Sequence, residues 1–135
     1  NGPNSMKILI VDDDPEVTDF LTSIAEQACW DVDAVSSGED AIGRSILSSY
    51  DLISLDVRMS GVSGLDAISV IRGLCAHTII AIVSAFTEVI EDNDLDAADL
   101  VIPKPVGVDV FRSLLTLTAE IVERRSSIRQ LGLQP

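Results

Sequence analysis

The sequence contains little cysteine. Only Cys29 and Cys75 are present, and they lie far apart in the chain. This number and spacing exclude a disulfide framework and a cysteine-based metal site. We therefore expect both thiols to be reduced and packed inside the fold.

Long hydrophobic runs are also missing. The longest apolar stretch is IIAIV, at 79–83, which even with its flanks is shorter than the roughly 18 residues that a membrane span needs. The sequence has no recognisable signal peptide. These absences predict a cytoplasmic protein without a membrane-spanning segment.

Basic residues are scarce. Nine lysines and arginines stand against 22 aspartates and glutamates, which gives a formal net charge of −13, and the only lysines are Lys7 and Lys104. Direct binding of nucleic acid by this domain is excluded, since it requires a surface rich in lysine and arginine. A cationic partner or a metal ion suits this charge better.

What the sequence does contain is a regular alternation of apolar patterns. Its 135 residues suffice for one domain with a single core, and residues 1–5, NGPNS, are interpreted as a cloning remnant before the first methionine. Runs of strand length alternate with helical patterns in the rest of the chain. The predicted strands are 7–11, 30–35, 51–55, 78–84 and 100–102.

Helix signals lie between these runs. Asp14 followed by proline, then Ser37, then Ser63 with Asp66 are predicted to begin the first three helices. The last helix is predicted at 108–122, after which the chain should fray. This alternation predicts a doubly wound α/β fold, in which helices cover both faces of a five-stranded parallel sheet.

Three acids follow strands at the sheet edge where such folds bind ligands. Asp12 and Asp13 follow the first strand, and Asp56 follows the third. If these strands are neighbours, as in the flavodoxin-like order 2-1-3-4-5, the acids converge, and two unit charges about 4 Å apart repel by about 4 kcal/mol. Such a cluster must raise a pKa or bind a cation, and oxygen ligands favour Mg²⁺.

Two further polar residues occupy the same edge. Ser84 ends the fourth predicted strand, and Lys104 follows the fifth. Acids, a hydroxyl and an ammonium from four strands then face one point, a set that can hold Mg²⁺ and an anion together. The alternative for each acid alone is that it caps a strand or a helix in solvent.

With these motifs the sequence resembles the receiver domain of two-component response regulators. The resemblance is carried by ILIVDDDPEV (8–17), SSGEDAI (36–42), DLISLDVRMSGVSGLDAI (51–68), Ser84-Ala85 and PKPV (103–106). It covers residues 6–122 and implies the family's three-layer α/β/α fold with strand order 2-1-3-4-5. Residues 123–135 are interpreted as the end of the last helix and a linker.

The resemblance also implies what the cluster does. Asp56 would accept a phosphoryl group from a sensor histidine kinase or a phosphotransfer protein, Ser84 would hydrogen-bond the phosphoryl oxygens, and Lys104 would pair with the phosphoryl group or with Asp56. The Lys104-Pro105 bond is typically cis in this family. The implied Mg²⁺ ligands are Asp12, commonly through water, Asp13, Asp56 and the backbone carbonyl of Arg58.

The family is a signalling family rather than a class of enzymes. The chain would perform at most its own phosphorylation and dephosphorylation, and a homodimer would form through the face of the fourth helix, fifth strand and fifth helix. Two other functions fit the same fold. A pseudo-receiver would bind partners without phosphotransfer, and a Mg²⁺-dependent phosphatase would need a second acid where Arg58 stands.

Several positions depart from the family pattern. Val101 stands where most receivers have the aromatic residue that reports phosphorylation, and 88–99 predicts a short, mobile or poorly formed fourth helix. Ser60 replaces a usual proline, and Cys29 replaces a common glycine before the second strand. The only histidine, His77, precedes the fourth strand and is interpreted as structural.

Overall fold

The computed structural model describes residues 5–59, 64–85 and 90–133. Across these residues five strands form one parallel sheet in the order β2-β1-β3-β4-β5, which confirms the predicted fold class. The strands are β1 (Lys7–Val11), β2 (Asp31–Val35), β3 (Leu52–Asp56), β4 (Ile79–Ser84) and β5 (Leu100–Pro103). Each strand begins and ends within one residue of its prediction.

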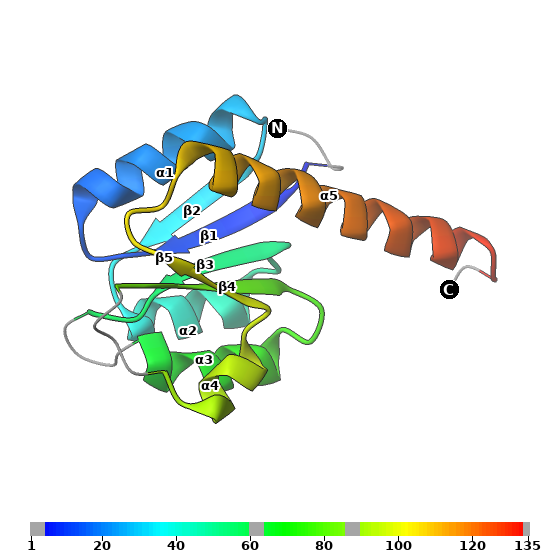
Figure 1. Cartoon of the computed structure of the whole chain (residues 1–135). Coiled ribbons are helices and arrows are strands. Elements are labelled where there is room, and N and C mark those ends of the chain that lie inside the picture. Colours follow the sequence, from blue (N-terminus) through cyan, green and yellow to red (C-terminus); the bar gives the residue numbers. More distant parts are fainter. Residues whose placement is uncertain (1–4, 60–63, 86–89, 134–135) are drawn as a thin grey trace.

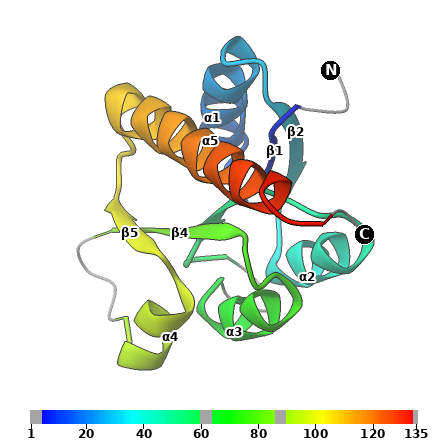
Figure 2. The same cartoon turned by 90° about the vertical axis from the view of Figure 1, so that its right-hand side faces the viewer.

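Helices cover both faces of the sheet (Figures 1 and 2). On one face lie α1 (Pro15–Gln27) and α5 (Val108–Gln130), and on the other lie α2 (Gly38–Leu47), α3 (Gly64–Leu74) and α4 (Asp92–Ala97). Each layer packs on its own buried apolar cluster, because the central strands are apolar on both faces. Among the described helices, none has the length and apolar character that a membrane crossing requires.

The local helix signals act largely as predicted. Asp14 Oδ1 accepts a hydrogen bond from the backbone N–H of Glu16 at 3.0 Å, and Ser37 Oγ accepts one from Asp40 at 3.1 Å, so both residues cap their helices. The predicted cap Ser63 lies outside the described residues. The helix α4 has six residues, which confirms a short fourth helix.

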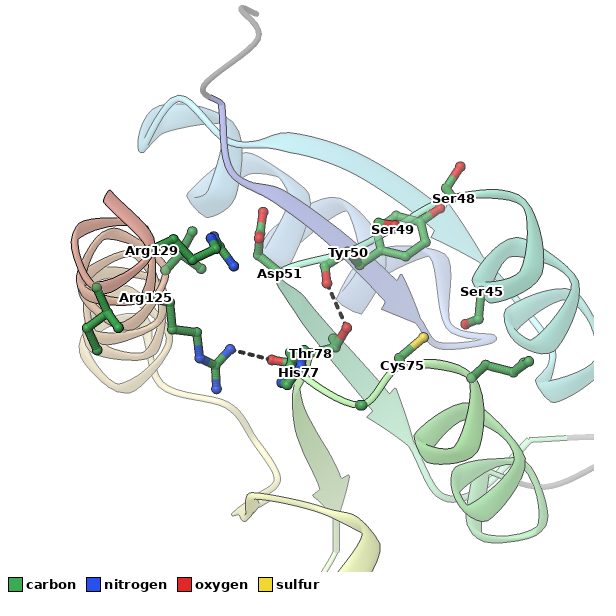
Figure 3. Close-up of a pocket in the computed structure, with 14 residues that line it drawn as sticks. Ser45, Ser48, Ser49, Tyr50, Asp51, Cys75, His77, Thr78, Arg125 and Arg129 are labelled. Carbon is green, nitrogen blue, oxygen red and sulfur yellow. Dashed lines mark hydrogen bonds between the residues drawn. The ribbon is translucent and has the colours of Figure 1, made fainter. Parts of the chain in front are cut away.

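The helix α5 continues to Gln130, so the prediction that the chain frays after residue 122 is wrong. Residues 123–130 contain neither glycine nor proline, and nothing in this segment interrupts a helix. Arg125 also donates from Nη1 to the backbone carbonyl of His77 at 2.7 Å (Figure 3). This contact ties the extended helix to the loop before β4, at the edge of the sheet away from Ser84.

Cys29 is exposed, so the prediction that both thiols are packed is wrong for this residue, whereas Cys75 packs against an apolar cluster. The reason is a tight connection between α1 and β2, where Trp30 is buried and Cys29 turns the chain with a φ of 66°. This is the left-handed region, which favours glycine.

Replacing this residue with glycine should stabilise the fold. The substitution Cys29→Gly removes the strain of a side chain at positive φ, and we expect a gain of about 0.5–1 kcal/mol in the free energy of unfolding, measured by urea denaturation. Cys29→Ala is the matched control, because it removes the thiol and keeps the Cβ. An equal gain from alanine would contradict this explanation.

Arg72 of α3 holds the connection between α3, β4 and α4. Its guanidinium donates to the carbonyl oxygens of Ala97 at 2.8 Å, Cys75 at 3.1 Å and Thr78 at 2.8 Å, and lies 2.7 Å from Asp99 Oδ2. One side chain therefore satisfies carbonyls of the α3–β4 connection and the last carbonyl of α4.

The substitution Arg72→Met should destabilise the fold by about 2 kcal/mol, because it leaves several partly buried carbonyl oxygens without a donor. The midpoint of urea denaturation measures this loss. Arg112→Met, which changes an exposed arginine of α5, is the control and should shift the midpoint little. Equal shifts for both variants would refute the role given to Arg72.

Candidate functional site

Parallel strands bring the predicted site residues to one edge of the sheet. Asp56 is the last residue of β3 and Ser84 the last of β4, while Asp12 follows β1 directly and Lys104 follows β5 directly. Because β1, β3, β4 and β5 are consecutive neighbours in the sheet, residues far apart in sequence meet where these strands end.

The three acids form one cluster. Ligand oxygens of Asp12, Asp13 and Asp56 lie within 4.8 Å of one another. Asp13 is exposed, but Asp12 is 5% and Asp56 only 2% exposed. The backbone N–H of Asp14 donates to Asp12 Oδ1 at 2.9 Å, which fixes one carboxylate of the cluster.

The electrostatic strain of this cluster is visible at Asp12. Burial raises the pKa of its carboxyl, the hydrogen bond from the Asp14 N–H lowers it, and the nearby charge of Asp56 raises it again. The net effect is a pKa above the ordinary value for aspartate. Burial, together with the charge of the neighbouring acids, therefore outweighs the hydrogen bond that stabilises the charged form of Asp12.

Lys104 supplies the positive charge at this edge. Its Nζ lies 2.7 Å from Asp56 Oδ1, and its backbone N–H donates to the carbonyl of Ser84 at 2.8 Å. Desolvation lowers the pKa of Lys104, but the hydrogen bond and charge of Asp56, with the other acids, raise it above its ordinary value on balance. The Lys104-Pro105 bond is cis, as the resemblance implies.

The residues present fit a Mg²⁺ ion. Three carboxylates and one ammonium leave two uncompensated negative charges, and the metal-ligating side chains grouped here are all aspartates. Hard oxygen donors without histidine or cysteine suit Mg²⁺ rather than zinc or copper. Arg58 is held nearby, since its backbone N–H approaches Asp56 Oδ1 at 3.4 Å.

Ser84 completes the set as a buried hydroxyl. It is 5% exposed, and its Oγ donates to the carbonyl of the adjacent Ala85 at 3.0 Å. A hydroxyl that donates to the adjacent residue can turn to a stronger acceptor at small cost, because the bond it gives up is local. This edge of the sheet thus combines the buried Asp56 carboxylate with two kinds of hydrogen-bond donor, the Ser84 hydroxyl and the Lys104 ammonium.

Sequence reasoning missed Gly64, the first residue of α3. A Cβ on this residue would overlap the backbone carbonyl oxygen of Asp56 and lie 2.9 Å from the carbonyl carbon. The helix therefore starts in close contact with the end of β3. The only sequence signal for this contact was the glycine itself, at the start of the predicted helix. The spacing between residues 56 and 64 did not indicate that the two are in contact.

The opposite edge of the sheet holds a pocket of about 550 Å³ between α5 and the segments before β3 and β4 (Figure 3). Its lining includes Tyr50, Asp51, His77, Arg125 and Arg129. None of the predicted site residues lines it, so the acidic cluster and this pocket lie at separate edges of the sheet.

Comparison with known proteins gives one family. The family model described as "Response regulator receiver domain" matches residues 8–116. Transcriptional regulatory protein ResD of Bacillus subtilis is 35% identical over 77 residues, which are 57% of this chain and 32% of ResD. The CpxR homolog of Haemophilus influenzae is 29% identical over 122 residues, 90% of this chain and 52% of that protein. The chain thus spans about a third to a half of these curated relatives.

Solved structures share the fold. A CheY-like response regulator receiver domain protein from Methanospirillum hungatei gives a TM-score of 0.80 at 20% identity, covering 90% of this chain and 98% of that one. The response regulator TrrA from Thermotoga maritima, solved in complex with Mg²⁺ and BeF, gives 0.76 at 27% identity, covering 84% and 98%.

Proposed function

This chain belongs to the response regulator receiver domain family, and on that premise we propose that it accepts a phosphoryl group on Asp56 in a Mg²⁺-dependent reaction. The observation that carries the proposal is the placement of one buried carboxylate against Lys104 at 2.7 Å and within 4.8 Å of two further acids. Phosphoryl transfer needs a positioned nucleophile and positive charge on the transferred oxygens, and little else.

Asp12, Asp13, Asp56 and the backbone carbonyl of Arg58 would hold the Mg²⁺. When bound, the ion supplies positive charge that offsets the carboxylates and the phosphoryl oxygens. The TrrA complex with Mg²⁺ and BeF supports this assignment, because that protein is a relative of the same fold.

The donor would be a phosphohistidine on a sensor kinase or a phosphotransfer protein, in keeping with the response regulators among the relatives. An oxygen of Asp56 attacks phosphorus, the phosphorus–nitrogen bond breaks, and the imidazole keeps the electron pair. Lys104 stays beside the new phosphoryl oxygens, and the Ser84 hydroxyl turns from the Ala85 carbonyl to one of them. The domain therefore signals by changing its own charge and has no separate substrate to turn over.

The read-out of this event lies on the face formed by α4, β5 and α5. Val101 is 38% exposed on β5, so no aromatic side chain is available there to rotate inward. We propose that Ser84 and the segment that follows β4 carry the signal to this face. A homodimer partner or a target protein would bind there, and signalling would take place in the cytoplasm. A pseudo-receiver is disfavoured, since the acids, Ser84 and Lys104 are all present at one edge.

Intact mass after incubation with acetyl phosphate tests the proposal. We expect a gain of one phosphoryl group with Mg²⁺ and none when EDTA removes it, because the three acids repel the donor without a cation. A folded chain that gains no phosphoryl group in the presence of Mg²⁺ would contradict the proposal and favour a pseudo-receiver.

A second measurement concerns Lys104. The substitution Lys104→Met keeps an unbranched side chain that is one atom shorter and removes its charge, so phosphorylation by acetyl phosphate should slow by about 100-fold. Mg²⁺ should bind at least as tightly, because the ammonium that competes for Asp56 is gone. Lys7→Met is the control, since Lys7 lies at the start of β1, far from the cluster. Unchanged phosphorylation in Lys104→Met would refute this role.

A further inference from the structure

The pocket at the edge of the sheet opposite the acidic cluster has a size that suits a small molecule. Its volume is about 550 Å³, within the range of about 300–1,000 Å³ that is usual for ligand pockets. Its floor lies where β3 and β4 begin, and the last part of α5 faces the ends of α2 and α3 across it (Figure 3). Along β3, Asp51 and Asp56 are about 17 Å apart at about 3.3 Å per residue, so this pocket is separate from the phosphoacceptor.

Hydrogen bonds inside the fold hold the floor of the pocket in place. The Thr78 hydroxyl donates to the carbonyl of Tyr50 at 2.7 Å, and the Tyr50 hydroxyl donates to Asp33 Oδ2 at 2.6 Å. Asp51 Oδ2 accepts a hydrogen bond from the backbone N–H of Lys7 at 2.9 Å. A ligand would therefore meet a preformed surface, and little ordering of the protein would oppose its binding.

This pocket carries positive charge, although the chain as a whole is acidic. Arg125 and Arg129 of α5 line it, and Asp51 is the only carboxylate in its lining within the part of the chain that the structure describes. With His77 neutral, two guanidinium groups and one carboxylate leave one net positive charge, whereas the formal charge of the whole chain is −13. Figure 3 shows both arginines reaching from α5 toward the floor. The lining therefore favours an anion.

Arg125 is held in a position from which it can bind such an anion. Its Nη1 donates to the backbone carbonyl of His77 at 2.7 Å, which fixes the guanidinium at the wall of the pocket (Figure 3). This bond uses one of the five N–H donors of an arginine side chain, so others can reach a ligand oxygen. A guanidinium matches the two oxygens of a carboxylate, to which it can donate two parallel hydrogen bonds.

Apolar side chains supply the second part of the recognition. Leu74, at the end of α3, and Ile128 of α5 both line the pocket, and they are 47% and 67% exposed. Val122 and Cys75 lie in the same lining. A ligand with an apolar body would remove this surface from water, which favours its binding.

We propose that this pocket binds a small molecule that has an apolar body and one carboxylate group. The carboxylate would lie between Arg125 and Arg129, and the apolar body would lie against Leu74 and Ile128. One net positive charge matches the single negative charge of a carboxylate. A phosphate monoester carries nearly two negative charges at neutral pH and would leave an excess. The proposal does not rest on phosphorylation of Asp56.

Titration of the intact chain with phenylpropionate, followed by the backbone amide shifts in NMR at constant ionic strength, tests the proposal. We expect saturable shifts at Asp51, His77 and Thr78 with a Kd of about 1 mM or lower, and none at Lys104. Phenylpropanol has the same body without the charge and should bind about tenfold more weakly. No saturation by about 10 mM, or equal binding of the alcohol, would overturn the proposal. Shifts centred on Lys104 would place the anion at the other edge and overturn it too.

Substitutions locate the carboxylate. Arg129→Met should weaken the binding of phenylpropionate about tenfold, because one of the two guanidinium groups is lost. Arg124→Met is the matched control, since Arg124 is an exposed arginine of the same helix outside this lining, and it should leave the Kd unchanged. Equal losses in both variants would contradict the site. Phosphorylation by acetyl phosphate should be unchanged in Arg129→Met, so the two proposals can fail independently.

A second pair of variants locates the apolar body. Ile128→Ser should weaken binding about threefold, because apolar contact surface is lost. Ile46→Ser is the matched control, since Ile46 of α2 is 66% exposed and lies outside this lining. Equal losses for both serine variants, or tighter binding of phenylpropyl phosphate than of phenylpropionate, would overturn the assigned ligand. Circular dichroism checks that each variant is folded.

Discussion

Replacing Asp56 with asparagine should abolish the gain of a phosphoryl group, with a fall in rate of about 10⁴-fold or more, equivalent to about 5.5 kcal/mol of activation free energy. The amide oxygen is a poor nucleophile and carries no charge, so both the attack on phosphorus and one metal ligand are lost. Asp56 is the acid whose oxygen lies 2.7 Å from the Lys104 ammonium, so no neighbouring carboxylate has the same setting.

Intact mass after incubation with acetyl phosphate and Mg²⁺ measures this effect. Asp96→Asn is the matched control, because it makes the same change of charge at an exposed residue of α4 and should leave phosphorylation unchanged. Phosphorylation of Asp56→Asn at the native rate would mean that Asp12 or Asp13 is the acceptor, and it would refute the assignment of Asp56. The substitution should not unfold the chain, since it also removes one of three mutually repelling charges.

The position of the acidic cluster could be predicted from the sequence because two simple rules apply to it. Central parallel strands are apolar on both faces, so their ends can be read from the sequence, and residues that follow them share one edge. Asp12, Asp56 and Ser84 stand at the ends of central strands, Lys104 follows the edge strand β5, and the structure brings all four to one edge of the sheet. The prediction also needed the order of the strands in the sheet, which came from the family resemblance.

Other features were not predictable because they depend on contacts between distant segments. No spacing rule indicates that Arg72 donates to the carbonyl of Ala97, 25 residues further along the chain. The length of α5 was missed because residues 123–130 lack the apolar periodicity of a packed helix, and a polar segment with good helix formers reads equally well as a linker. The positive φ of Cys29 was hidden because the residue that carries it is not glycine.

The contact between Gly64 and Asp56 leads to the largest expected effect on stability. A methyl group at Gly64 would overlap the Asp56 carbonyl oxygen and lie 2.9 Å from its carbonyl carbon and 3.0 Å from the Cα of Val57. These are backbone atoms of a buried strand end, so they cannot rotate away as a flexible side chain could. We expect Gly64→Ala to lower the free energy of unfolding by about 3 kcal/mol.

The same change should also slow phosphorylation in the molecules that remain folded. Relief of the overlap requires α3 or the end of β3 to move, and Asp56 would then lose its alignment with Lys104 and the other acids. Urea denaturation measures the first effect and intact mass the second. Gly43→Ala is the control, because a Cβ there meets nothing within 4 Å and alanine favours the helix, so this variant should gain about 0.5–1 kcal/mol. If both variants shifted stability in the same direction, the close approach of α3 to Asp56 would not be the reason for glycine at position 64.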